Sequence, residues 1–303
     1  MPNLPATMLV CASGEPAGRF PALANDILRQ LAHLRSVVPT RALDAAVIYD
    51  PPFDPTVRQV LDRAGRHPPE FLSETNSGDP ATYTDFASWA RERCRGESLI
   101  IVLSGHGLGW QDSRALAAIM ARGIPGGSES AARTRAMLPD RTPAGPDLLT
   151  NAEITGLMRD MAAIWGKKPA CIVFDGCNMS CIEVAHELRH VVGATVAALD
   201  QLSSGGLDLA GAARAISSLP DNASDADFAS CFASSYTPAH PCDTCVALDL
   251  ASPHFAQGVA EFAEFTEDLL AWSAANRAQD DRLRRAISSA SERMRRSTAF
   301  SFA

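Results

Sequence analysis

The sequence contains no long apolar run: none of its hydrophobic stretches approaches the roughly 18 residues needed to cross a bilayer. Residues 1–16 also lack a basic segment followed by a long apolar one, which is the pattern of a secretory leader. We therefore expect a cytoplasmic protein with no membrane contact, or a secreted protein if a leader has been removed.

Positive charge is also scarce. The chain has 27 lysine and arginine residues against 35 aspartate and glutamate residues, and its net charge is −8. Such a surface repels a phosphate backbone unless its basic residues are segregated. Arginines do gather at residues 282–296, but a solvated helix face accounts for them. We expect no nucleic-acid partner.

A metal-binding pattern is missing as well. Cys242 and Cys245 have the spacing of a metal knuckle, but only His240 accompanies them. His186 and His190 lie four residues apart, as an exposed pair on one helix face would. The eight cysteines, without a secretory leader, are interpreted as reduced thiols. We predict no metal centre and no required cofactor.

Strand-like and helix-like segments alternate along the chain, which predicts an α/β fold with a mostly parallel sheet and helices on both faces. Six strands are expected, at residues 7–12, 42–49, 98–104, 169–174, 194–199 and 244–250. Helices are expected at residues 20–37, 56–63, 80–95, 150–165, 177–190, 206–217, 225–235, 253–276 and 280–296. No repeat or linker divides this pattern, so residues 1–303 should form one domain with C-terminal helices at 251–303.

Two of the expected strands end in a small residue followed by a reactive one. The run Leu-Ile-Ile-Val-Leu-Ser-Gly leads to His106, and the run Cys-Ile-Val-Phe-Asp-Gly leads to Cys177. Ligands of an open parallel sheet bind beyond the carboxyl ends of its strands. A lone cysteine or histidine in such a place is more commonly structural. Two of them at neighbouring strand ends favour a thiol–imidazole pair.

Such a pair can cleave peptide bonds. His106 would take the thiol proton of Cys177 and later protonate the leaving amine. A helix expected to begin at Cys177 would lower the pKa of the thiol. The backbone N–H groups of Gly107 and Cys177 are candidate donors to the oxyanion of the tetrahedral intermediate. We predict a cysteine endopeptidase that acts on proteins or peptides through a thioacyl intermediate.

Four segments also carry a resemblance to a known family. They are Asn-Ser-Gly-Asp-Pro at the start of 76–86, Ser-Gly-His-Gly-Leu-Gly-Trp at 104–110, Phe-Asp-Gly-Cys-Asn-Met at the start of 174–188, and Val-Ala-Leu-Asp-Leu at 246–250. They resemble the clostripain family, which are caspase-like cysteine peptidases grouped with gingipains and separases. The resemblance implies a caspase-like α/β/α sandwich, a dyad of His106 and Cys177, and cleavage after Arg or Lys. Some members of the family require calcium.

The resemblance weakens after the fifth expected strand. Relatives carry there an acidic residue that helps bind a basic substrate side chain, and this chain has Gly205 in that place. Asp175 remains, and Asp200 or Asp208 are candidates to compensate. A carboxylate at the floor of such a pocket would bind a guanidinium in bidentate fashion. The alternative role for Asp175 is as N-cap of the helix expected at Cys177.

Residues 111–149 form a long, loop-like segment between the two reactive residues. His106 and Cys177 are 71 positions apart, against roughly 50 in caspases. Because relatives mature by cutting themselves between these residues, the resemblance implies an activation site here. The candidate cleavage positions are Arg114, Arg122, Arg133 and Arg135. The alternative is a disordered insertion that is never processed.

Two other functions remain open. One is a gated caspase-like effector protease of a bacterial defence or cell-death system, activated by a partner or a small-molecule signal. The other is a non-catalytic ligand-binding module, because doubly wound folds serve many functions. Residues 12–16, Ala-Ser-Gly-Glu-Pro, lack the repeated glycines of a phosphate loop, which argues against the second.

Overall fold

The computed structural model describes most of the chain. The described residues are 4–14, 22–51, 54–62, 64–107, 109, 136–140, 147–199, 202, 205–238, 244–276, 281–286 and 288–289. Among them, no helix is long and apolar enough to cross a bilayer.

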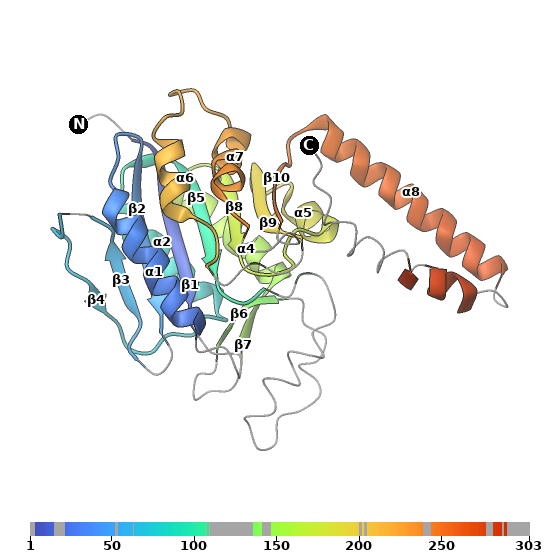
Figure 1. Ribbon diagram of the computed structural model, residues 1–303, viewed down its shortest axis with the longest axis horizontal. Helices are drawn as coiled ribbons and strands as arrows, with labels where there is room; N and C mark the ends of the chain where they lie inside the picture. The colour runs from blue at the N-terminus through green and yellow to red at the C-terminus, as the bar shows by residue number, and fades with distance from the viewer. Residues whose placement is uncertain are drawn as a thin grey trace, which may run out of the picture.

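An eight-stranded sheet forms the centre of the molecule (Figure 1). Its strands are β1 (Leu4–Ser13), β2 (Leu43–Asp50), β3 (Val57–Val60), β4 (Glu70–Phe71), β5 (Gly96–Ser104), β8 (Cys171–Asp175), β9 (Ala194–Ala198) and β10 (Cys245–Asp249). Their spatial order is β10-β9-β8-β5-β1-β2-β3-β4. The strands from β9 to β2 are parallel, whereas β10, β3 and β4 are antiparallel to their neighbours. All six expected strands are present, so the mostly parallel α/β fold is confirmed, but the strand count was too low.

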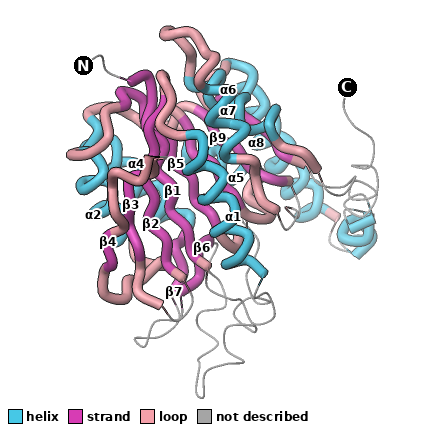
Figure 2. The backbone as a smooth tube through the Cα atoms, turned by 60° about the vertical axis from the view of Figure 1, so that its left-hand side comes forward, coloured by secondary structure: helices cyan, strands magenta, loops and turns pink. Residues whose placement is uncertain are grey.

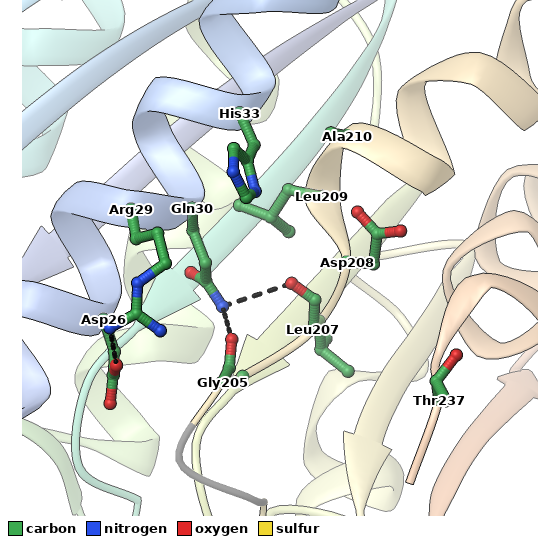
Figure 3. A pocket seen from close by; sticks show the side chains of 11 residues that line it. Asp26, Arg29, Gln30, His33, Gly205, Leu207, Asp208, Leu209, Ala210 and Thr237 are labelled. Carbon is green, nitrogen blue, oxygen red and sulfur yellow. Dashed lines mark hydrogen bonds and ion pairs between the residues drawn. The ribbon is translucent and has the colours of Figure 1, made fainter. Parts of the chain in front are cut away.

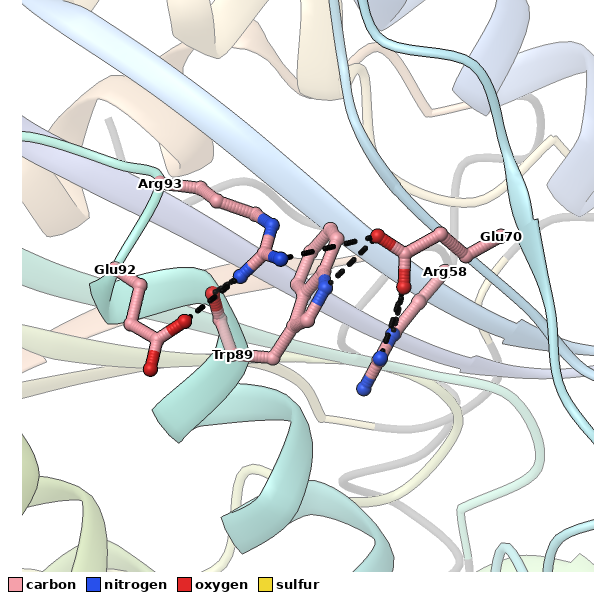
Figure 4. A network of polar contacts seen from close by, with 5 residues as sticks. All are labelled: Arg58, Glu70, Trp89, Glu92 and Arg93. Carbon is pink, nitrogen blue, oxygen red and sulfur yellow. Dashed lines mark hydrogen bonds and ion pairs between the residues drawn. The ribbon is translucent and has the colours of Figure 1, made fainter.

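The two additional strands lie at one edge of the sheet. Residues 56–63 were expected to be a short helix, and this is wrong, because Val57–Val60 pairs antiparallel with the end of β2. A segment this short takes its conformation from the strand beside it. Side-chain contacts join this edge of the sheet to the helix at Pro80–Arg91, which carries Trp89 (Figure 4). Trp89 lies between the guanidinium groups of Arg58 and Arg93, and its indole N–H donates to Glu70 at 3.1 Å.

Helices cover both faces of the sheet (Figure 2). One face carries α1 (Ala22–Val37), α6 (Leu209–Ile216) and α7 (Asp225–Ser235), and the other carries α2 (Pro80–Arg91), α4 (Asn151–Trp165) and α5 (Ile182–Leu188). Successive residues of a strand point to opposite faces. In β1, Leu9 and Cys11 therefore enter one core, while Met8 and Val10 enter the other.

Local sequence signals explain where several helices begin. Asp79 accepts a hydrogen bond from the Ala81 N–H at 2.9 Å, with Pro80 as first helical residue, so the expected cap of α2 is confirmed. Thr150 and Glu153 form a capping box at the start of α4. Each cap satisfies N–H groups that the first turn of a helix cannot pair internally.

Two elements lie beside this body. The β6 (Ala136–Asp140) and β7 (Asp147–Thr150) strands form a hairpin inside the segment that was expected to be loop throughout. The α8 helix (Pro253–Ala275) follows β10, extends away from the sheet in Figure 1, and has no buried residue. That 1–303 is a single domain stays a prediction.

Candidate active site

The carboxyl ends of β5 and β8 bring the two reactive residues to one edge of the sheet. The strands are parallel neighbours, and Ser104 is paired in register with Asp175. His106 and Cys177 each lie two residues beyond this pair. The Gly105 N–H donates to the Asp175 carbonyl at 3.1 Å, so the two chains stay side by side as they leave the sheet.

Glycines allow the two loops to pack against each other directly. A Cβ atom on Gly107 would overlap the Cys177 carbonyl oxygen and lie 2.9 Å from Met179 Cγ. A Cβ atom on Gly176 would lie 2.7 Å from the Gly105 oxygen and 3.2 Å from the Gly107 nitrogen. Real Cβ atoms do not occupy such positions, so these glycines are required by close approach.

The loop that carries His106 is held from its other side by the β6–β7 hairpin. Gly107 forms an antiparallel bridge with Met137, and the Leu138 N–H donates to the His106 carbonyl at 3.1 Å. Leu138 has a φ of 53°, a left-handed conformation that is costly for a side chain of this kind. The hairpin thus fixes the backbone of the histidine loop.

The His106 imidazole is half-buried, and its Nε2 atom is shielded from solvent. Burial disfavours the charged form and lowers the pKa of His106 below its ordinary value of 6.5. The imidazole is therefore neutral at pH 7 and able to accept a proton.

Cys177 is half-buried and lies in a turn. Its sulfur accepts a hydrogen bond from the Leu202 N–H at 3.4 Å. The expected helix beginning at Cys177 is wrong, because α5 begins at Ile182 with Cys181 as its N-cap. The Ser180 N–H instead donates to the Ala198 carbonyl at the end of β9, so this stretch lies beside that strand end before the chain becomes helical. Cys177 therefore does not lie in the first turn of α5, where the dipole of that helix would act most strongly on its thiol.

Asp175 is buried, with 5% of its surface exposed, and it does not cap a helix. Its Oδ2 accepts from the Ser104 hydroxyl at 2.7 Å, and its Oδ1 accepts from the Leu207 N–H at 2.8 Å. Burial raises the pKa of this carboxyl, and hydrogen bonds from Ser104, Leu207 and Gln30 oppose that rise. The carboxylate ties the segment that follows β9 to the ends of β5 and β8.

A cavity of about 270 Å³ lies beside that segment, between α1 and the start of α6 (Figure 3). Asp208 lines it together with Asp26, Gln30 and the backbone of Gly205. The Asp208 carboxylate also caps α6 by accepting from the Gly211 N–H at 2.7 Å. Arg29 also lines the cavity and pairs with Asp26 at 2.9 Å.

Other expected site residues lie outside the described residues. These are Asp200 and the four candidate cleavage positions Arg114, Arg122, Arg133 and Arg135. The described residues include no group of three His, Cys, Asp or Glu side chains arranged to hold a metal ion, and Cys242 is not among them.

Three contacts at the site were not foreseen from the sequence. Gln30, Leu138 and Leu202 reach the site from α1, β6 and the segment after β9. None of them belongs to a motif. The contacts of Leu138 and Leu202 use backbone N–H groups, which every residue except proline has, so the identity of these residues could not indicate them. The role of Ser104 could have been predicted from the sequence, because this residue ends a strand directly before Gly105 and His106.

The comparisons with known proteins agree with this architecture. A family model described as the clostripain family matches residues 60–251. No curated protein matches the chain.

Three similar solved structures share the fold. A secreted C11 cysteine protease from Bacteroides thetaiotaomicron, in complex with an irreversible peptide inhibitor, is 17% identical with a TM-score of 0.54, over 77% of this chain and 59% of that one. A second structure of a secreted C11 protease from that organism, called iotapain, is 17% identical with a TM-score of 0.55, over 83% and 67%. An inactive zymogen C11 protease from Parabacteroides distasonis is 16% identical with a TM-score of 0.57, over 82% and 63%. This chain thus spans about three-fifths of the first of these structures.

Proposed function

The chain belongs to the clostripain family, whose model matches more than half of its length, and on this premise we propose that it is a cysteine endopeptidase. Cys177 is the nucleophile and His106 is the general base. The observation that carries this proposal is the register of β5 and β8, which sets both residues two positions beyond one cross-strand pair.

The reaction follows from the groups at this edge. Neutral His106 accepts the thiol proton, and the thiolate attacks the peptide carbonyl carbon. The carbonyl oxygen becomes an oxyanion, for which the backbone N–H groups of Gly107 and Cys177 are the proposed donors. The protonated imidazole then gives its proton to the leaving amine, and a thioester forms. Water attacks the thioester with His106 as base, which releases the acid and restores the thiol.

Cleavage after Arg or Lys is the proposed specificity. The support for it is the Asp208 carboxylate, which lines the cavity beside Gly205; the Asp26 carboxylate in the same lining is paired with Arg29 at 2.9 Å. The buried Asp175 carboxylate, held by Ser104 and Leu207, adds negative charge behind the same segment. Asp200 remains a further candidate. A guanidinium or ammonium group is the substrate feature that such carboxylates attract.

Self-processing between His106 and Cys177 is also proposed. Residues 111–135 connect the histidine loop to the β6–β7 hairpin that supports it, so a cut among them would free the two from their covalent connection. One of the similar solved structures is described as an inactive zymogen. Calcium dependence and control by a partner or small-molecule signal remain open predictions of the sequence.

Covalent labelling tests the proposed function. A peptide ending in arginine and carrying a thiol-reactive group is incubated with the full chain, and the adduct is located by intact mass and peptide mapping. We expect one adduct, on Cys177, and none after His106→Ala at neutral pH. Labelling of another cysteine, or equal labelling of His106→Ala, would refute the dyad.

A further inference from the structure

The side chain of Gln30 links the α1 helix to the segment that follows β9 (Figure 3). Its Nε2 atom donates to the Gly205 carbonyl at 2.8 Å and to the Leu207 carbonyl at 3.1 Å. The same side chain lies beside the Asp175 carboxylate and acts to lower its pKa. Gln30 therefore contacts three groups that are far from it in the sequence.

The contact leaves no free space around Gly206. This residue has a φ of 64°, a conformation that favours glycine. A Cβ atom on Gly206 would overlap Gln30 Nε2 and lie 2.7 Å from Asp175 Oδ1. The amide of Gln30, the backbone of Gly206 and the carboxylate of Asp175 thus form one packed unit, which we call the Gln30 clasp.

The clasp is close in sequence to Leu202, the residue that donates a hydrogen bond to the Cys177 sulfur. Leu202, whose N–H donates to Cys177 Sγ, is three positions before Gly205. Holding Gly205–Leu207 in place therefore limits where the Leu202 N–H can lie. A donor to the sulfur favours the thiolate over the thiol, because it stabilises the charged form.

We propose that Gln30 is a positioning residue for the nucleophile: its amide fixes the segment after β9 so that the Leu202 N–H meets the Cys177 sulfur and stabilises the thiolate. This inference deepens the proposed function and rests on it for the role of Cys177. Gln30 itself touches no reacting atom.

The test compares two amide-removing substitutions on the same helix. Gln30→Met keeps the length of the side chain and removes its donors. The matched control is Asn25→Leu, which removes an amide from an exposed position of α1 outside the cavity lining. The rate of alkylation of Cys177 by iodoacetamide is measured against pH, with peptide mapping to distinguish Cys177 from other thiols.

We expect the midpoint of the Gln30→Met profile to move up by about half to one pH unit, and the rate below the midpoint to fall about three- to tenfold. Asn25→Leu should reproduce the wild-type profile. An unchanged midpoint in Gln30→Met, or an equal shift in Asn25→Leu, overturns the proposal.

A second variant keeps the test decisive if Gln30→Met does not fold. Gly206→Ala retains Gln30 but places a methyl group between its amide and Asp175, and it should shift the midpoint in the same direction. A folded Gly206→Ala protein with the wild-type profile contradicts the proposal. Alkylation needs no peptide hydrolysis, so a shifted midpoint in Gln30→Met together with a wild-type protein that cleaves no peptide refutes the proposed function alone.

Discussion

Ser104 donates its hydroxyl hydrogen to Asp175 Oδ2 at 2.7 Å, directly across the register of β5 and β8. The two residues are the last of their strands, and both are buried. The pair therefore lies at the end of both strands, immediately before the loops that carry His106 and Cys177. Its hydrogen bond joins the two halves of the candidate active site.

Removing the Ser104 hydroxyl should lower the stability of the folded chain. Ser104→Ala leaves a buried carboxylate with one donor fewer, and we expect a loss of about 1–3 kcal/mol in the free energy of unfolding. Urea denaturation measures it. Ser98→Ala, on the same strand at an exposed contact with Lys167, is the control and should change stability by less than about 0.5 kcal/mol. Equal effects of the two substitutions would contradict the role given to Ser104.

Gly107 tests the close approach of the two loops. Gly107→Ala places a methyl group on the Cys177 carbonyl oxygen, so one loop must move. Misplacement of about 1 Å can cost on the order of 100-fold in rate, and we expect a fall of that size in kcat/KM for an arginine peptide. Gly156→Ala, in α4 with open space around it, should leave kcat/KM unchanged. A fully active Gly107→Ala enzyme would disprove the packing argument.

The burial of His106 predicts a pH dependence of stability. Its pKa in the folded chain lies below the ordinary 6.5, so between these two values the unfolded chain binds more protons than the folded one. Stability should therefore fall as the pH decreases below 6.5. Urea unfolding of wild type and His106→Gln across this range measures the effect. The substitution should make the decline shallower, and parallel curves would argue against a buried imidazole.

Asp208 tests the proposed preference for basic residues. Asp208→Asn removes the charge but keeps a residue that caps helices, so α6 should stay intact. We expect kcat/KM for an arginine substrate to fall about tenfold, while a substrate with uncharged citrulline in that place should be little affected. An equal change for both substrates would mean that Asp208 does not contribute to the preference for a positively charged substrate side chain.

Self-processing is tested by comparing chain masses. Purified wild type should show two fragments from a cut within 111–149, next to Arg114, Arg122, Arg133 or Arg135, and Cys177→Ala should remain intact. The reason is that only a chain with its thiol can cut itself or its copies. Mass spectrometry of both preparations gives the answer. If both are cut, or neither is, the self-processing hypothesis is wrong.

Most of the sheet could be predicted, because strand signals are local. Apolar runs bounded by turns gave all six expected strands, and the Asp79-Pro80 pair located the start of α2. Where the expectation was wrong, a distant partner decided the conformation. Val57–Val60 is a strand because it lies against β2, and the helix after Cys177 starts late because Ser180 pairs with the end of β9.

By itself, the sequence determined which residues could form the site. Two apolar strands ending at His106 and Cys177, in a chain that alternates strands and helices, leave few places where their side chains can go. Only the tertiary structure decided what holds them there: Leu138 on the histidine loop, Leu202 on the sulfur, and Gln30 on the Gly205–Leu207 backbone. The physical reason is that these contacts join residues distant in sequence through single hydrogen bonds, many of them to backbone groups, and such bonds leave no periodic pattern along the chain.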